Sequence, residues 1–402
     1  MSAQVTLSKV RSIAVIEVNN PPVNALGHAV RKGLWDSIEV AEADNTVKAI
    51  VVIGAGRTFP AGADIKEFGT AMQQPHLPEV IDRIENCKKP VVAALHGTAL
   101  GGGFEVALGS HYRIASADAR IGLPEVNLGL LPGAGGTQRM PRLCGAKLAL
   151  DVMLSGKPIA ATKAHTAGLI DRLTEDDLKV AAIKFAEDVQ EVRRSCDETK
   201  CMLNAQAYRD AVAEAKKMVS TRMRGQLAPT KILECVTAAL EKPFAEGRAF
   251  ERASFFECLS SEQSKGMIHA FFAERASAKV PEASRAKPRK LESLGVVGGG
   301  TMGAGITVAA LDSGLPVTMI ERDAESIARG RANVEKVYDR LVAKGRKTED
   351  QKSAVMALYS GSTDYNDLSN VDMVIEAVFE RLDVKREAVS YTHLTLPTIY
   401  SV

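Results

Sequence analysis

The sequence lacks an excess of charge, paired cysteines and long apolar runs, and each absence excludes a class of protein. Of 402 residues, 51 are Lys or Arg and 49 are Asp or Glu, and a net charge of +2 is too balanced for an overall nucleic-acid or membrane-surface footprint. The six cysteines form no C-x-x-C pair, so we expect no metal site and no disulfide framework, but reduced thiols in an intracellular protein. No apolar run approaches the roughly 20 residues of a membrane span. Local sites must therefore carry the function.

The pattern of apolar residues predicts two α/β parts joined by helices. β-branched runs alternate with helical patterns from Ile13 to about Gly168, which favours βα units. The runs are Ser12–Val18, Ala49–Gly54 and Val91–Gly97, and the helical patterns are His28–Glu42 and Leu77–Asn86. From about Leu178 to Lys279 strand signals vanish and apolar residues follow helical spacing. A new strand pattern follows, ending in the glycines of LGVVGGG.

We divide the chain into five segments on this basis. The stretch from Val280 to Lys290 has two prolines and little to bury, so it is expected to be an exposed linker. The segments are residues 1–190, an α/β domain; 191–280, helical; 281–290, the linker; 291–389, a second α/β unit; and 390–402, a tail.

Three consecutive glycines precede a helical pattern in the stretch HGTALGGGFEVALG, from His96 to Gly109. Glycine disfavours helix, so three together indicate close approach of the backbone to a partner. Without Cβ atoms at 101–103, a ligand oxygen can reach the free amides of the first helical turn, where the helix dipole favours negative charge. This arrangement provides half of an oxyanion hole, and Glu105 follows at once. Alone, a glutamate in a first turn is more often structural.

Two further stretches complete the candidate site. Phe59–Phe68 is a second glycine-rich turn after a strand, and Glu125 follows Pro124 at the end of an apolar segment. Two carboxylates and two amide donors would suit enolate chemistry on a thioester. His96 and His111 accompany no nucleophile motif, so they are expected to be packing or surface residues.

The motifs AGADIKEF, HGTALGGGFE and LPEVNLGLLPGAGGTQRMPRL together resemble the crotonase (enoyl-CoA hydratase/isomerase) family over roughly residues 5–190. The resemblance implies a crotonase-like ββα spiral unit, followed by helices that close the acyl-CoA site. It also implies that the N–H groups of Ala63 and Gly102 form the oxyanion hole and that Glu105 and Glu125 are the acid/base pair. Hydration of trans-2-enoyl-CoA and isomerisation of 3-enoyl-CoA are the expected reactions. Arg275 and Lys279 are weaker candidates for contacts with the CoA phosphates.

The later glycines form a dinucleotide-binding pattern. Gly298, Gly300 and Gly303 give G-x-G-x-x-G between a strand and a helix, and Glu321 ends the next strand about 20 residues on. A carboxylate there favours NAD over NADP, although Arg322 is adjacent. This part resembles the amino-terminal part of the 3-hydroxyacyl-CoA dehydrogenase family, which implies a partial Rossmann-type parallel sheet with NAD as cofactor.

The order of these parts resembles the peroxisomal multifunctional enzymes of fatty acid β-oxidation. That resemblance implies a peroxisomal, monomeric protein acting on acyl-CoA, although the family's targeting tripeptide is absent here. The final SYTHLTLPTIYSV does not match the family, whose catalytic Ser and His of hydride transfer would follow. We therefore expect a truncated, inactive dehydrogenase with weak or absent NAD binding. A non-catalytic crotonase-fold binding protein and an NAD-binding sensor remain the alternatives.

Overall fold

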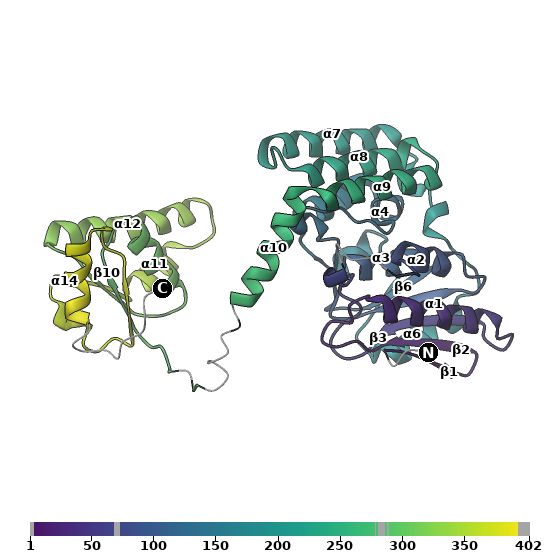
Figure 1. Ribbon diagram of the computed structural model, residues 1–402, viewed down its shortest axis with the longest axis horizontal. Coiled ribbons are helices and arrows are strands. Elements are labelled where there is room, and N and C mark those ends of the chain that lie inside the picture. The colour runs from purple at the N-terminus through teal and green to yellow at the C-terminus, as the bar shows by residue number, and fades with distance from the viewer. Residues whose placement is uncertain (1–3, 68–72, 278, 280–285, 288, 393–402) are drawn as a thin grey trace. The chain divides into compact units, whose positions relative to one another are not determined.

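The computed structural model describes residues 4–67, 73–277, 279, 286–287 and 289–392. The chain forms two compact units, Met1–Ala278 and Lys279–Val402 (Figure 1). Most of the predicted linker and residues 393–402 of the predicted tail lie outside the described residues. Among the described helices, none is both long enough and apolar enough to cross a bilayer.

A six-stranded sheet forms the base of the first unit. Its order is β1-β2-β3-β4-β6-β9, with β1 antiparallel to β2 and every other neighbouring pair parallel. The strands are β1 Val5–Val10, β2 Ile13–Val18, β3 Ala49–Gly54, β4 Val91–Leu95, β6 Tyr112–Ser116 and β9 Arg172–Thr174. β3 and β4 are buried throughout because both faces of the sheet are covered.

Helices cover the two faces of this sheet unequally. One face packs on the large core that includes Leu34, Ile81 and Phe104, and the other packs on α6 through Ala182 and Phe185. A small sheet of β5 Thr98–Leu100, β7 Arg120–Gly122 and β8 Ile159–Ala160 adjoins the large core. The helices are α1 His28–Ala43, α2 Leu77–Glu85, α3 Gly102–Gly109, α4 Gly136–Ser155, α5 Ala161–Thr166 and α6 Leu178–Asp188, with short 3-10 helices η1 Ile65–Glu67 and η2 Glu125–Leu128.

The expected all-helical segment is confirmed and belongs to the first unit. Helices α7 (Ala205–Arg222), α8 (Leu227–Glu241) and α9 (Phe244–Ser260) stack over α4 on the side remote from the six-stranded sheet (Figure 1). The segment contains η3 Ser195–Asp197, η4 Lys200–Met202, α7 Ala205–Arg222, α8 Leu227–Glu241, α9 Phe244–Ser260 and α10 Glu262–Ser277. Buried residues of α8, such as Ile232 and Val236, extend the large core of the α/β part.

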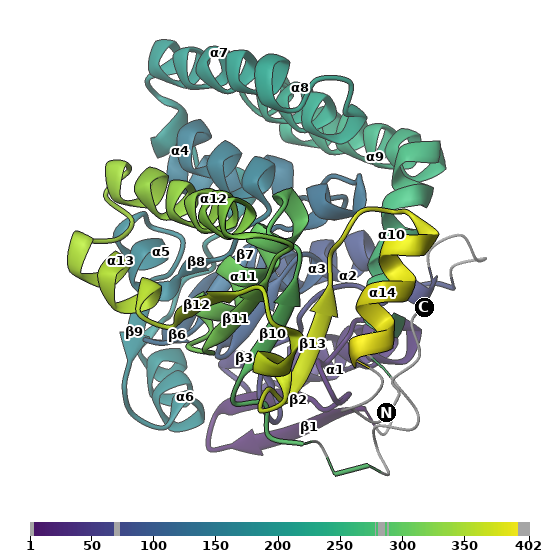
Figure 2. The ribbon, with the colours of Figure 1, turned by 90° about the vertical axis from the view of Figure 1, so that its left-hand side faces the viewer.

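The second unit is a four-stranded parallel sheet in the order β12-β11-β10-β13, which confirms the expected partial Rossmann-type sheet. Figure 2 draws this unit in green to yellow, with its strands and helices labelled. Its strands are β10 Leu294–Val297, β11 Val317–Ile320, β12 Tyr359–Ser362 and β13 Met373–Glu376. Its helices are α11 Thr301–Asp312, α12 Ala324–Ala343, α13 Glu349–Met356, η6 Tyr365–Leu368 and α14 Leu382–Thr392. It has its own core around Val296, Met319 and Tyr338.

Candidate active site

One pocket of the first unit is lined by all four predicted site residues, Ala63, Gly102, Glu105 and Glu125. They come from the loop after β3, the amino end of α3 and the start of η2. Most other lining residues are apolar, among them Leu26, Leu77, Leu128, Leu130, Pro124 and Phe255. The other charged or polar lining residues are Arg31, Asp64, Glu67, His76 and Arg252, so Glu105 and Glu125 lie in a pocket whose walls are mostly apolar.

The amino end of α3 packs against the loop after β3 at the glycines. A Cβ atom at Gly103 would lie 1.7 Å from the carbonyl oxygen of Pro60, so only glycine fits there. A Cβ at Gly102 would lie 3.3 Å from the amide nitrogen of Ala63. Gly101, which precedes the helix, has a φ of 51°. The glycine run thus brings the backbone of residues 102 and 63 together beside the pocket.

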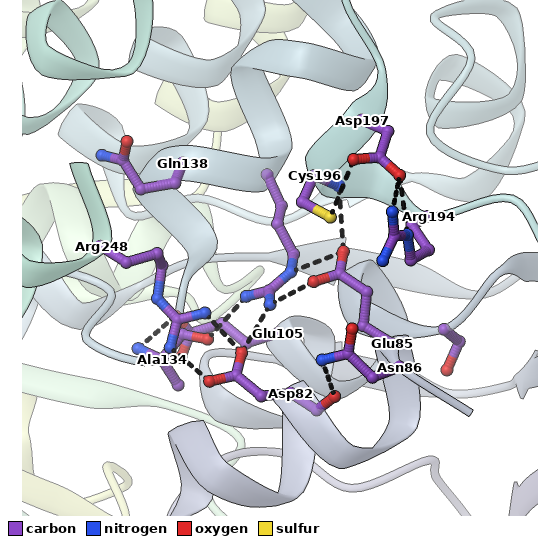
Figure 3. Close-up of polar contacts among 12 residues, drawn as sticks. Asp82, Glu85, Asn86, Glu105, Ala134, Gln138, Arg194, Cys196, Asp197 and Arg248 are labelled. Carbon is purple, nitrogen blue, oxygen red and sulfur yellow. Dashed lines mark hydrogen bonds and ion pairs between the residues drawn. The ribbon is translucent and has the colours of Figure 1, made fainter. Parts of the chain in front are cut away.

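Glu105 is a buried carboxylate held by backbone donors. The residue is 3% exposed, and its Oε1 accepts a 2.8 Å hydrogen bond from the N–H group of Ala134 (Figure 3) and another of 2.8 Å from that of Gly136. Gly136 is the first residue of α4, so the carboxylate binds the positive end of that helix. Burial raises the pKa of Glu105, while these two hydrogen bonds oppose the rise.

Glu125 has poorer partners than Glu105. Its Oε1 lies 3.0 Å from the position of a Cβ atom at Gly101, which places the carboxyl group beside the start of α3. Its Oε2 is buried and has no hydrogen-bond partner among the described residues. Burial and the nearby charge of Glu105 raise the pKa of Glu125 well above its usual value. The surroundings therefore favour the protonated form at Glu125, a candidate proton donor, and give Glu105 two donors that stabilise its ionised form, a candidate acceptor.

A buried ionic network lies near this pocket and is not predicted from the sequence. Arg139 of α4 is fully buried and pairs with Glu85 at 2.7 Å and Asp82 at 2.9 Å, both on α2. Arg248 of α9 also pairs with Asp82, at 2.8 Å, and Figure 3 shows these side chains near Glu105. Glu251, also on α9, is 1% exposed and bonds to Thr137. The available signal was the spacing of three residues in Asp82/Glu85 and Arg248/Glu251, which puts each pair on one helix face.

The two histidines and the two basic residues singled out from the sequence do not line the pocket. His111 is buried and bonds through its ring to the N–H of Val91 and the carbonyl of Glu85. The ring of His96 contacts the carbonyl of Gly56. Arg275 lies over the ring of Phe271, 3.8 Å from its centroid, and Lys279 is exposed.

In the second unit, the glycine motif forms a tight turn between β10 and α11. Gly298 has a φ of 101°, and a Cβ at Gly303 would lie 1.8 Å from the Gly298 carbonyl oxygen. A Cβ at Gly300 would have nothing within 4 Å, so the loop is open at the amino end of α11. Glu321 directly follows β11, and its Oε1 accepts a 2.7 Å hydrogen bond from the N–H of Gly299. These residues fit a dinucleotide, whose pyrophosphate binds such an open helix start and whose ribose binds such a carboxylate.

Comparison with known families agrees with both parts of this description. The family model "Enoyl-CoA hydratase/isomerase" matches residues 8–246, which is more than half of the chain. The chain belongs to the enoyl-CoA hydratase/isomerase family. A second model, "3-hydroxyacyl-CoA dehydrogenase, NAD binding domain", matches residues 293–396.

Individual members of the enoyl-CoA hydratase/isomerase family show how far the similarity extends. The chain is 40% identical over 388 residues to the peroxisomal bifunctional enzyme of Danio rerio and 38% identical over 387 residues to that of Homo sapiens. Each alignment covers 94% of this chain and 53% of the relative, so the chain spans about half the length of these curated relatives. The crystal structure of carnitinyl-CoA hydratase from Mycobacterium avium is 30% identical, with a TM-score of 0.51, over 68% of this chain and 97% of that chain.

Proposed function

We propose that the first unit hydrates trans-2-enoyl-CoA to 3-hydroxyacyl-CoA and shifts 3-enoyl-CoA to 2-enoyl-CoA in fatty acid β-oxidation. The observation that carries this proposal is the pair of carboxyl groups, Glu105 and Glu125, in one apolar pocket beside a glycine-led helix start. Membership of the enoyl-CoA hydratase/isomerase family supports it.

In this proposal the N–H groups of Ala63 and Gly102 bind the thioester oxygen. Negative charge moves onto that oxygen as the enolate forms, and two fixed donors stabilise the charge without reorganising. The dipole of α3 acts in the same direction, and the apolar walls strengthen both hydrogen bonds by excluding water. Removing one such donor typically costs about 2.7–4 kcal/mol of transition-state stabilisation.

The unequal surroundings of the two glutamates give each a role. Glu105, stabilised by two backbone donors, orients the water and accepts a proton as the water oxygen bonds to Cβ of the substrate. Glu125, whose pKa is raised, donates its proton to Cα. In one turnover Glu105 gains a proton and Glu125 loses one. Transfer of a proton from Glu105 to Glu125 then restores the starting state of the pair. For isomerisation, the ionised form of Glu125 takes a proton from Cα of the 3-enoyl thioester and returns it to C4, the far carbon of the original double bond.

We further propose the domain division and assembly expected from the sequence, with 1–190 as the crotonase-like domain, 191–280 completing the acyl-CoA site and 291–389 as a partial NAD-binding domain. Phe255 and Arg252 of the helical segment line the same pocket as Glu105, which supports the second assignment. The monomeric state implied by the family resemblance stays a prediction. The names of the curated relatives support a peroxisomal location.

For the second unit we propose NAD as the ligand. The open turn at Gly300 would receive the pyrophosphate, and Glu321 would bind the ribose hydroxyls. When bound, NAD supplies a hydride acceptor for a 3-hydroxyacyl thioester. Arg322 pairs with Asp323 at 2.8 Å, so its charge is partly offset where a 2′-phosphate would need it, which supports NAD over NADP. The strength of binding, expected from the sequence to be weak or absent, stays a prediction.

Hydration of crotonyl-CoA by the purified full chain tests the proposal. We expect Glu105→Gln and Glu125→Gln each to lower kcat by about 100-fold or more, because each removes one partner in proton transfer. Glu246→Gln is the matched control, since Glu246 is exposed in the first turn of α9 and the change removes the same charge. Wild-type turnover in either site variant would rule out the acid/base assignment, and no turnover in the unmodified chain would rule out the activity.

A further inference from the structure

Glu251 is a third buried carboxyl group, contributed to the active-site region by the helical segment. It lies on α9, and its Oε2 accepts a 3.0 Å hydrogen bond from the N–H of Thr137 and a second from the Thr137 hydroxyl. Its Oε1 is buried without a hydrogen-bond partner among the described residues, and the nearest cation is Nε of Arg248 at 3.8 Å. Burying a carboxyl group so incompletely paired is costly, which indicates a role beyond packing.

Glu251 and Glu105 bind neighbouring amides of one helix. Glu105 accepts from the N–H of Gly136 and Glu251 from that of Thr137, the first two residues of α4. The amino end of α4 is therefore held between a carboxylate of α3 and a carboxylate of α9. Glu251 does not line the pocket, so any effect on the reaction must pass through its neighbours.

We propose that Glu251 is a positioning residue of the hydratase site, which fixes the amino end of α4 beside Glu105 and places a second negative charge behind the two acid/base groups. This inference rests on the proposed hydratase function and identifies a residue that controls proton transfer in that reaction. It also gives the helical segment a part in the reaction other than closing the pocket.

The charges around Glu251 determine how its ionisation affects the two acid/base glutamates. The titratable and charged groups that interact with it are Glu105 on α3, Glu125 on η2, Arg139 on α4, Cys235 on α8, and Arg248 and Arg252 on α9. Burial and the charge of Glu105 raise the pKa of Glu251 to about 7. The negative charge of ionised Glu251 raises the pKa of Glu125 further, which helps Glu125 to keep the proton that it must donate.

The pH dependence of crotonyl-CoA hydration by the full chain tests this role. In Glu251→Gln the charge is lost while an oxygen that can accept from Thr137 remains. Glu125 should then lose its proton at lower pH, so the midpoint of the alkaline limb of kcat/KM falls by about half a pH unit or more. Glu251→Asp keeps the charge and should return the midpoint toward the wild-type value.

The controls separate this role from a structural one and from failure of the proposed function. Glu246→Gln removes an exposed charge from the same helix and should leave the profile unchanged. If Glu251→Gln lowers kcat equally at every pH, or leaves the midpoint in place, the proposal is overturned while the hydratase function stands. If Glu251→Gln is insoluble, the pH profile of Thr137→Val tests the proposal instead. This substitution removes one donor to Glu251 and should move the midpoint the same way, and a wild-type midpoint there overturns the proposal.

Discussion

At the scale of single residues, the site depends on the different hydrogen-bond supply of two glutamates in one pocket. Glu105 has two backbone donors on one oxygen, whereas Oε2 of Glu125 has none among the described residues. A carboxyl group without donors holds its proton, and one with donors releases it more easily. The same difference in hydrogen bonding makes the stability of the first unit depend on pH.

We predict that Glu125→Gln stabilises the first unit increasingly as pH rises. The raised pKa of Glu125 means that the folded state binds its proton more tightly than the unfolded chain does. Stability from this group is therefore complete below its ordinary pKa of 4.5 and is lost as pH rises toward the folded-state pKa. Each unit of difference costs about 1.4 kcal/mol, and glutamine avoids that loss.

Thermal unfolding of the first unit between pH 5 and about pH 9 measures this effect. We expect the Tm of Glu125→Gln to exceed that of wild type by a margin that widens with pH, even though hydration is lost. Glu246→Gln, which changes an exposed carboxylate, should follow the wild-type curve. A constant margin across this range would mean that Glu125 titrates normally in the folded protein.

At the scale of elements, the amino end of α3 separates the requirements of folding from those of catalysis. Two adjacent glycines have different neighbours. An added Cβ at Gly103 would meet backbone, the Pro60 carbonyl oxygen, at 1.7 Å. At Gly102 it would meet the end of the Leu77 side chain at 2.6 Å, which can move, and the Ala63 nitrogen at 3.3 Å.

We therefore predict opposite outcomes for two one-carbon substitutions. Gly103→Ala should lower the free energy of unfolding by about 1–3 kcal/mol, because α3 must move away from the loop after β3. Gly102→Ala should keep nearly the wild-type Tm but lower kcat roughly tenfold or more, because the methyl group occupies the space beside the Ala63 amide. Urea unfolding and crotonyl-CoA hydration measure the two effects. Full activity in Gly102→Ala would show that the oxygen of the substrate binds elsewhere.

The elements also show what the sequence can and cannot predict. β2, β3 and β4 are predicted because buried parallel strands read as continuous β-branched runs. β1 was missed because it is an edge strand with one buried residue, and its polar residues resemble a loop.

Within the candidate site, too, the sequence predicts local motifs but not contacts between distant residues. The glycine turns and both glutamates lie in motifs, so the sequence indicates them directly. Glu251 bonds to Thr137, 114 residues away, and Arg139 pairs with Glu85, 54 residues away. Such contacts depend on how α9 and α2 pack on α4, which periodicity along one helix does not determine.

At the scale of the whole molecule, two units with separate cores carry two separate glycine-led helix starts. The pocket of the first unit is lined only by residues from Leu26 to Phe255, and the glycine motif of the second lies between β10 and α11. The described residues of each candidate site belong to a single unit. The two proposed ligand-binding functions should therefore respond to different substitutions in the same chain.

We predict that Gly300→Val in the full chain lowers NAD affinity at least about tenfold, measured by calorimetry, and leaves crotonyl-CoA hydration unchanged. A Cβ atom at 300 would have no protein atom within 4 Å, so we expect the fold to tolerate valine, whose side chain fills the space through which a phosphate approaches the α11 amides. Gly305→Val is the matched control, because that position is equally open but lies outside the motif. Glu105→Gln should show the reverse pattern, with NAD affinity kept and hydration lost. Equal NAD affinity in Gly300→Val and wild type would exclude the motif as the binding site. No measurable affinity in wild type would show that this unit does not bind NAD and would leave the hydratase proposal intact.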